Sequence, residues 1–170
     1  FSATEVNIMP PACKPLDIAG IGFSINQLKT LSLNLFSRKP EKHLEKVKAF
    51  GMDGRLNHIY SAGDYLFLDI SYHNKTRLKY DIADLRFKLD DKKVTKASNV
   101  QSVELKPVFT LFSVPVFSKY YRNIFVIKKL TYPGNKILHA ELSVQQISGR
   151  LIALGISYKD VLDAGTLPSD

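Results

Sequence analysis

The sequence predicts a mainly β protein, with an immunoglobulin-like antiparallel β-sandwich of about seven strands that follows an N-terminal helical or irregular segment. Two observations carry this prediction. From Phe50 onward, short segments alternate apolar and polar residues with a period of two, which is typical of strands that bury one face. Turn-forming pairs such as Gly63-Asp64, Asn74-Lys75 and Pro133-Gly134 separate these segments, and no helical pattern lies between them.

The expected strands differ in how they are buried. Leu85 and Phe87 alternate with the basic Arg86, so the two apolar side chains are expected to face the core. Ile124–Ile127 is instead an uninterrupted apolar run, which predicts a strand buried on both faces. The complete set of expected strands covers residues 54–60, 66–72, 85–89, 103–105, 124–127, 138–144 and 152–158.

One helix is expected before the strands. Ser24 and Gln27 fit a capping box, in which each side chain accepts a hydrogen bond from the other residue's backbone N–H. An apolar stripe at helical spacing follows, made up of Ile25, Leu28, Leu31 and Leu35. Residues 41–48 are rich in charge and predict a short amphipathic helix or a charged connector. We therefore expect residues 1–49 to be an irregular connector with one or two short helices, and residues 50–170 to be the β-sandwich domain.

The composition is that of an ordinary globular chain. Of 170 residues, 45% are hydrophobic and 24% are charged, which argues against a disordered or fibrous protein. The net charge of +8 is spread along the chain, with 7 basic and 4 acidic groups in residues 1–49 and 17 and 12 in residues 50–170. Because carboxylates are interspersed throughout, we expect a mixed solvated surface and no specific nucleic-acid binding. The single cysteine, Cys13, excludes an internal disulfide framework and is expected to be a free thiol without a role.

The usual catalytic signatures are absent from the sequence, which has no Gly-rich phosphate loop, no Gly-x-Ser-x-Gly elbow and no His-Glu-x-x-His motif. The four histidines share no metal-ligand spacing. The densest acidic cluster is interleaved with lysines and arginines, so we expect it to be charge-compensated; it comprises Asp81, Asp84, Asp90 and Asp91. The sequence thus predicts a protein that is not an enzyme, with no catalytic residues, no metal site and no cofactor.

An aromatic segment from Phe109 to Tyr121 is the candidate partner-binding region. Exposed aromatic and arginine side chains are favoured at protein interfaces. The residues selected on this basis are Phe109, Phe112, Tyr120, Tyr121 and Arg122. An exposed sheet edge is a second candidate surface, because its unpaired backbone groups can accept an added strand.

One string, Tyr80-Asp81-Ile82-Ala83-Asp84-Leu85-Arg86-Phe87 followed by Asp91-Lys92-Lys93, resembles the C-terminal region of the TraN proteins encoded by Bacteroidetes conjugative transposons. The turn at Asn74-Lys75-Thr76 and the segment Glu104–Pro107 fit the same pattern in order. Ser148-Gly149-Arg150 resembles the Gly-Gly-Arg turn of that family, with serine in place of its first glycine. The resemblance covers about residues 50–165. Its motif residues are Tyr80, Asp81, Ile82, Asp84, Leu85, Arg86, Phe87, Asp91, Lys92, Lys93, Gly149 and Arg150.

The resemblance implies a non-enzymatic scaffold component of a conjugative transfer complex, similar to a type IV secretion machine, in the periplasm and associated with the outer membrane complex. Its partners would be other subunits of that complex and further copies of itself in the assembly, with only indirect membrane association. The motif string has a second interpretation, in which it maintains the fold and Tyr80 closes a strand corner with its hydroxyl bonded locally. The alternative function is a β-sandwich that binds carbohydrate or another surface ligand through the aromatic segment.

Overall fold

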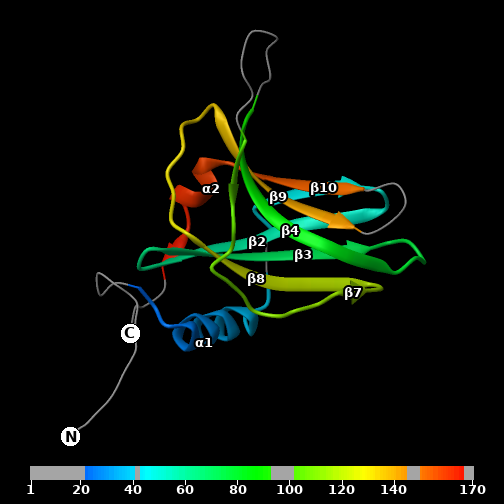
Figure 1. Ribbon diagram of the computed structural model, residues 1–170, viewed down its shortest axis with the longest axis horizontal. Coiled ribbons are helices and arrows are strands. Elements are labelled where there is room, and N and C mark those ends of the chain that lie inside the picture. The colour runs from blue at the N-terminus through cyan, green and yellow to red at the C-terminus, as the bar shows by residue number, and fades with distance from the viewer. Residues whose placement is uncertain (1–21, 41–42, 93–101, 145–149, 167–170) are drawn as a thin grey trace, which may run out of the picture.

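The computed structural model describes residues 22–40, 43–92, 102–144 and 150–166. It is an antiparallel β-sandwich with one helix packed on its outside (Figure 1), so the predicted fold class is confirmed. The elements in chain order are α1 (Ile25–Phe36), β1 (Glu45–Ala49), β2 (Met52–Ala62), β3 (Tyr65–Asn74), β4 (Tyr80–Asp91), β5 (Val103–Leu105), β6 (Phe109–Thr110), β7 (Val116–Phe117), β8 (Tyr120–Lys128), β9 (Lys136–Val144), β10 (Leu151–Ile156), α2 (Tyr158–Leu162) and β11 (Gly165–Thr166).

The strands form two sheets. The first, here called the helix-covered sheet, has the order β1-β2-β3-β8-β6, with β11 paired in parallel to β2. The second, here called the outer sheet, has the order β10-β9-β4-β5, with β7 paired to β4. The described residues contain the seven predicted strands and four further short ones, namely β1, β6, β7 and β11.

The main core lies between the two sheets. Phe87 of β4 is fully buried there, with its ring edge-on to that of Phe125 at a centroid distance of 5.8 Å. Leu85 and Leu89 are partly buried and pack against the same cluster. The predicted alternation in β4 therefore holds, with the deepest burial at Phe87.

A second, smaller core lies between α1 and the helix-covered sheet. It consists of Leu28, Leu35, Ala62, Phe67, Ile124 and Val126. Because α1 covers the face of β8 that points away from the main core, all of Ile124–Ile127 is buried. The prediction of a strand buried on both faces is confirmed.

Helix α1 begins where the sequence predicts. The Ser24 N–H donates to Gln27 Oε1 at 2.8 Å, and the Gln27 N–H donates to Ser24 Oγ at 3.2 Å, which closes the capping box. The predicted apolar stripe is wrong at Ile25, which is 59% exposed. Ile25 is the first residue of α1, and the buried face consists of Leu28, Ser32 and Leu35, with Leu31 partly buried against the smaller core.

The described part of the predicted connector contains a strand as well as a helix. Within residues 41–48, where the sequence predicts a helix or charged linker, Glu45–Lys48 belongs to β1. β1 pairs with β2 along its whole length, and Val47 packs against the main core. The predicted division between residues 49 and 50 therefore falls inside a β-hairpin. At the other end of the chain, Tyr158 starts α2 and does not extend the last strand.

Glu45 of β1 meets α2 through a carboxyl pair. Its side chain is hydrogen-bonded to that of Asp160, whose carboxylate also accepts the Ser157 N–H in the capping box of α2. Burial, followed by the hydrogen bond and the charge of Asp160, raises the pKa of Glu45 from 4.5 to about 7. This contact between two carboxyl groups links β1 to α2.

Phe87→Ala is expected to lower the free energy of unfolding by about 3–5 kcal/mol, because it removes a fully buried ring from the main core. Leu85→Ala, on the same face of β4 but only partly buried, is the matched comparison and should lose less. Urea unfolding followed by circular dichroism measures both. Equal losses for the two variants would contradict this account of the core.

Glu45→Gln is expected to change how stability depends on pH. Since the folded protein holds the Glu45 proton up to about pH 7 while the unfolded chain releases it near its ordinary pKa of 4.5, the unfolding free energy of the parent should fall across that interval as pH rises. Glutamine does not titrate, so the variant should show a flatter pH profile and gain stability relative to the parent above about pH 7. Urea unfolding at several pH values provides the test, with Glu104→Gln as the control. If the stability of Glu45→Gln depends on pH as steeply as that of the parent, the Glu45–Asp160 contact does not cause the pH dependence.

Candidate protein-binding surface

Two residues of the predicted aromatic surface are buried. Tyr121 is only 7% exposed and belongs to the main core, where its ring stacks on Tyr72 at 6.2 Å. Its hydroxyl accepts a hydrogen bond from Asn123 Nδ2 at 2.9 Å. The choice of Tyr121 as a surface contact is therefore wrong: β8 has already begun at Tyr120, so the next side chain points into the sandwich.

Arg122 points to the opposite face of β8 and is also engaged within the molecule. It forms a bidentate ion pair with Asp69, in which Nη2 lies 2.6 Å from Oδ2 and Nε lies 2.9 Å from Oδ1. It also donates to the backbone carbonyls of Phe36 and Arg38, both at 2.9 Å. The hydrogen bond to Asp69, with the charge of that carboxylate, outweighs burial and raises the pKa of Arg122 above the ordinary arginine value. Arg122 therefore attaches the end of α1 to the sheet and is not a free contact residue, contrary to the prediction.

The other three aromatic candidates lie in different places. Phe109 is half-buried in β6 and packs against the smaller core. Phe112 is partly exposed, with its ring edge-on to Phe36 at 4.9 Å. Tyr120 is 57% exposed at the start of β8, opposite His73. The aromatic segment is therefore not one platform, and Tyr120 is its most exposed aromatic side chain.

The motif string follows β4 and is mostly structural. Phe87 and Tyr80 are buried, and Ile82 and Leu85 pack against the main core. Asp81, Asp84 and Lys92 are exposed. Arg86 forms ion pairs with Asp84 at 3.6 Å and Glu104 at 3.4 Å, and Asp91 pairs with Lys136 at 2.6 Å. Lys93 and Gly149 lie outside the described residues.

Three members of the acidic cluster, Asp84, Asp90 and Asp91, are paired within the outer sheet. Asp90 lies 2.8 Å from His139 Nδ1. Burial acts to raise the pKa of Asp90, but hydrogen bonds from Ser102 and His139 outweigh it and hold that pKa below the ordinary value. In the part of the chain that the structure describes, no three His, Cys, Asp or Glu side chains are grouped so as to hold a metal ion.

Three loops and the start of β10 meet at one end of the sandwich, on the right in Figure 1. We call this region the loop end. It comprises the β1–β2 turn (Phe50, Gly51), the β3–β4 loop (residues 75–79), the β7–β8 connection with the first residue of β8 (Ser118, Lys119, Tyr120), and Arg150 with Leu151.

Asn74 joins two of these loops. Its Nδ2 donates to the carbonyls of Leu78 at 2.6 Å and Ser118 at 2.7 Å, and its Oδ1 accepts from the N–H and the hydroxyl of Thr76 at 2.9 and 2.7 Å. These four bonds use the full hydrogen-bonding capacity of the amide. A backbone bond from Lys75 N–H to Gly51 O at 2.9 Å ties in the β1–β2 turn. The loops are therefore held in one fixed arrangement.

Phe50 stands at the centre of the loop end. Ala49 and Met52 are paired, so Phe50 and Gly51 alone make the hairpin turn, and both have positive φ (54° and 74°). Such two-residue turns favour Asn-Gly, and an aromatic residue in this left-handed conformation costs roughly 1–2 kcal/mol. Burial does not offset this cost in full, because Phe50 is 48% exposed.

Two motif segments that are far apart in the sequence both contact Phe50. The hydroxyl of Tyr80, which the sequence predicts to bond locally, instead donates to the carbonyl of Phe50 at 2.9 Å. The guanidinium carbon of Arg150 lies 4.9 Å from the centroid of the Phe50 ring, within the range of a cation–π contact. Tyr80 and Arg150 thus fix the backbone and the ring of Phe50.

Phe50, Arg77 and Leu78 are not among the predicted contact residues, although Leu78 is 65% exposed. Two features of the sequence could have indicated them. One is Phe50-Gly51, an aromatic residue followed by glycine between two segments of strand-like pattern. The other is the set of alternating cations Lys75, Arg77 and Lys79 after the predicted turn at Asn74-Lys75. Alone, each pattern indicates only a solvated loop. The fold brings them together.

A family described as "Domain of unknown function (DUF4138)" matches residues 24–166. The chain belongs to this family. The match runs from the N-cap of α1 to the end of β11, so the DUF4138 domain includes α1 and β1 together with the sandwich. No curated protein and no solved structure matches the chain. No helix among the described residues is long and apolar enough to cross a membrane.

Asn74→Ala is expected to destabilise the DUF4138 domain by about 2–3 kcal/mol, because it removes the Nδ2 donor that bonds to the carbonyls of Leu78 and Ser118. Hydrogen exchange should quicken at the β3–β4 loop and the β7–β8 connection before it does in β3. The control is Asn135→Ala, at an exposed turn position. Unchanged exchange in the loops of Asn74→Ala would show that this amide does not hold them together.

Proposed function

We propose that this DUF4138 domain is a non-enzymatic scaffold that binds partner subunits through its loop end. The observation that carries the proposal is Phe50, an exposed aromatic ring in a strained backbone conformation. Strain of this kind persists where the surrounding structure enforces it, and it is concentrated at functional sites. A rigid, partly exposed aromatic side chain is also a common energetic centre of protein interfaces.

The loop end suits recognition because it is already organised. Asn74, Tyr80 and Arg150 hold the surface in place through contacts within the domain. Binding to such a surface loses little conformational entropy, which leaves more of the contact energy for affinity. Exposed Leu78 and Tyr120 extend the apolar area on the same loops.

The resemblance to the TraN C-terminal region supplies the setting of the proposal. On that basis the domain would be a component of the cell-envelope complex that carries out conjugative transfer, in the periplasm and next to the outer membrane complex. Two of the motif positions, Tyr80 and Arg150, support Phe50 directly. The motif would therefore maintain both the fold and the shape of the contact surface.

The proposal is tested with Phe50→Asn, which removes the ring and installs the residue that the turn prefers. Since Asn-Gly relieves the strain at positive φ, the variant should melt at or above the parental temperature. In donor cells it should co-purify with the transfer complex roughly tenfold less well than the parent, and DNA transfer should fall in parallel.

The matched control for Phe50→Asn is Leu162→Asn in α2, an apolar residue away from the loop end that is 68% exposed, more than Phe50 at 48%. It should retain both co-purification and transfer. If Phe50→Asn keeps parental co-purification and transfer, the loop end is not the contact. Loss of glycan binding in its place would support the carbohydrate-binding alternative.

A further inference from the structure

Positive charge surrounds the exposed apolar side chains of the loop end. Five cations lie on it, namely Lys75, Arg77, Lys79, Lys119 and Arg150, while the nearby carboxylates are Asp53 and Asp81. Lys75 pairs with Asp53 at 3.0 Å. Arg77 and Lys119 are exposed and have no ion-pair partner among the described residues.

These two cations are fixed in position through their backbones. Arg77 lies between Thr76 and Leu78, both of which are bonded to Asn74. The Lys119 carbonyl accepts the N–H of Asn74 at 2.8 Å. Arg77 and Lys119 therefore sit on neighbouring loops that share one anchor, so a single ligand can meet both.

We propose that the loop end binds an acidic segment of a partner protein, one in which carboxylates alternate with large apolar side chains. The proposal rests on the scaffold function proposed above and specifies the chemistry of the partner. Carboxylates of the segment would meet Arg77 and Lys119, and an apolar side chain would pack on Phe50 and Leu78. Complementary charge speeds encounter and excludes like-charged competitors, while the apolar contact supplies most of the affinity.

The geometry favours a protein over a phosphate-bearing ligand. The Arg150 guanidinium lies over the Phe50 ring and holds that ring in a fixed position. A ring held in this way presents a fixed contact area, which suits a folded or extended peptide better than insertion into lipid. Exposed Leu78 next to Arg77 would also remain uncovered in a purely ionic contact with a nucleic-acid backbone.

The test uses the full chain and three probes: a synthetic peptide of alternating Glu and Leu with one Phe, vesicles of anionic phospholipid, and a single-stranded oligonucleotide. The parent should bind the peptide, and Arg77→Glu with Lys119→Glu should weaken that binding by at least about tenfold. A peptide with Lys in place of Glu should bind the double variant better than it binds the parent. Raising the salt concentration should weaken parental binding.

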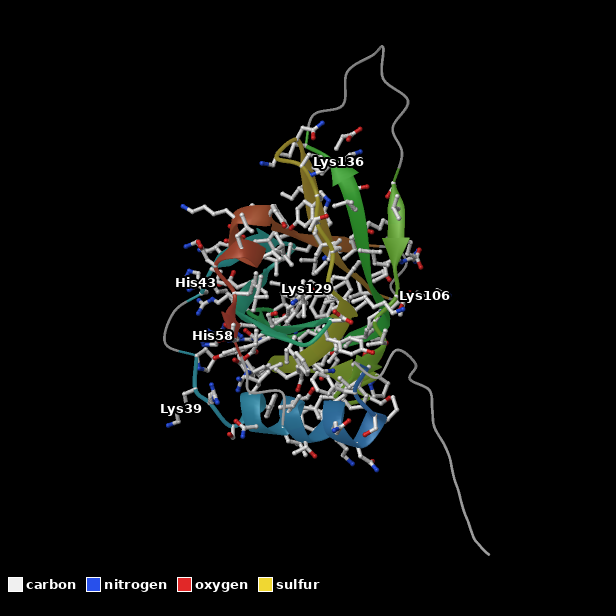
Figure 2. The ribbon with its side chains drawn as sticks, turned by 90° about the vertical axis from the view of Figure 1, so that its left-hand side faces the viewer. Lys39, His43, His58, Lys106, Lys129 and Lys136 are labelled. Carbon is white, nitrogen blue, oxygen red and sulfur yellow. The ribbon has the colours of Figure 1, made fainter. Side chains whose placement is uncertain are left out.

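The matched control reverses Lys128 and Lys129 to Glu, which changes the net charge by the same amount. Lys129 lies at the opposite end of the sheets, the end that faces the viewer in Figure 2. This control should bind the acidic peptide as the parent does. Equal weakening by both double variants would mean that only overall charge matters and would overturn the proposed site.

The remaining outcomes separate this inference from the scaffold function. If the vesicles or the oligonucleotide bind more tightly than the peptide and lose binding in Arg77→Glu with Lys119→Glu, the partner is not an acidic protein segment. If that double variant still co-purifies with the transfer complex while Phe50→Asn does not, the scaffold function stands and the acidic partner is wrong. If both retain co-purification, both proposals fail.

Discussion

The buried ion pair between Asp69 and Arg122 is the interaction on which the three layers of the molecule depend. Asp69 is 1% exposed in the central part of β3, and a carboxylate in that position is tolerated only when it is paired and hydrogen-bonded. Arg122 supplies the charge, and Asn57 Nδ2 supplies a further hydrogen bond at 3.1 Å. The remaining guanidinium donors reach the carbonyls at the end of α1. One polar cluster thus links α1 to β2, β3 and β8.

This arrangement explains why the helix-covered sheet has no solvated face at its centre. An antiparallel sheet in a two-layer sandwich normally exposes one face to water. Here α1 covers that face, and Leu28 and Leu35 pack on Phe67 and Ile124. The Asp69–Arg122 pair fills the polar part of the same interface, and Arg122 bonds to the carbonyls at the end of the helix. The loop end lies at the ends of strands in this sheet, namely β1, β2, β3 and β8.

The loop end differs from the cores because part of its backbone is in an unfavourable conformation. The cores gain stability from burial, while the β1–β2 turn holds Phe50 in a conformation that is unfavourable for it. Tyr80 and Arg150 stabilise that turn from elements distant in the sequence. Natural domains commonly retain such locally costly arrangements where recognition requires them. The contrast between a well-packed sandwich and a strained turn is the physical basis for proposing that this end binds partner subunits.

The sequence by itself determined the elements that follow from local periodicity and local capping. The capping box at Ser24, the alternation around Phe87 and the apolar run of Ile124–Ile127 each follow from backbone geometry, so they predicted α1, β4 and β8. The turn at Asn74-Lys75 was predicted for the same reason. Only the tertiary structure decided which polar residues are buried and which loops meet. Alternation puts Arg122 on the face away from the main core, but only the packing of α1 makes that face interior. Likewise, Phe50, Tyr80 and Arg150 lie far apart in the chain, and nothing local indicates that strand pairing and sheet packing bring them together.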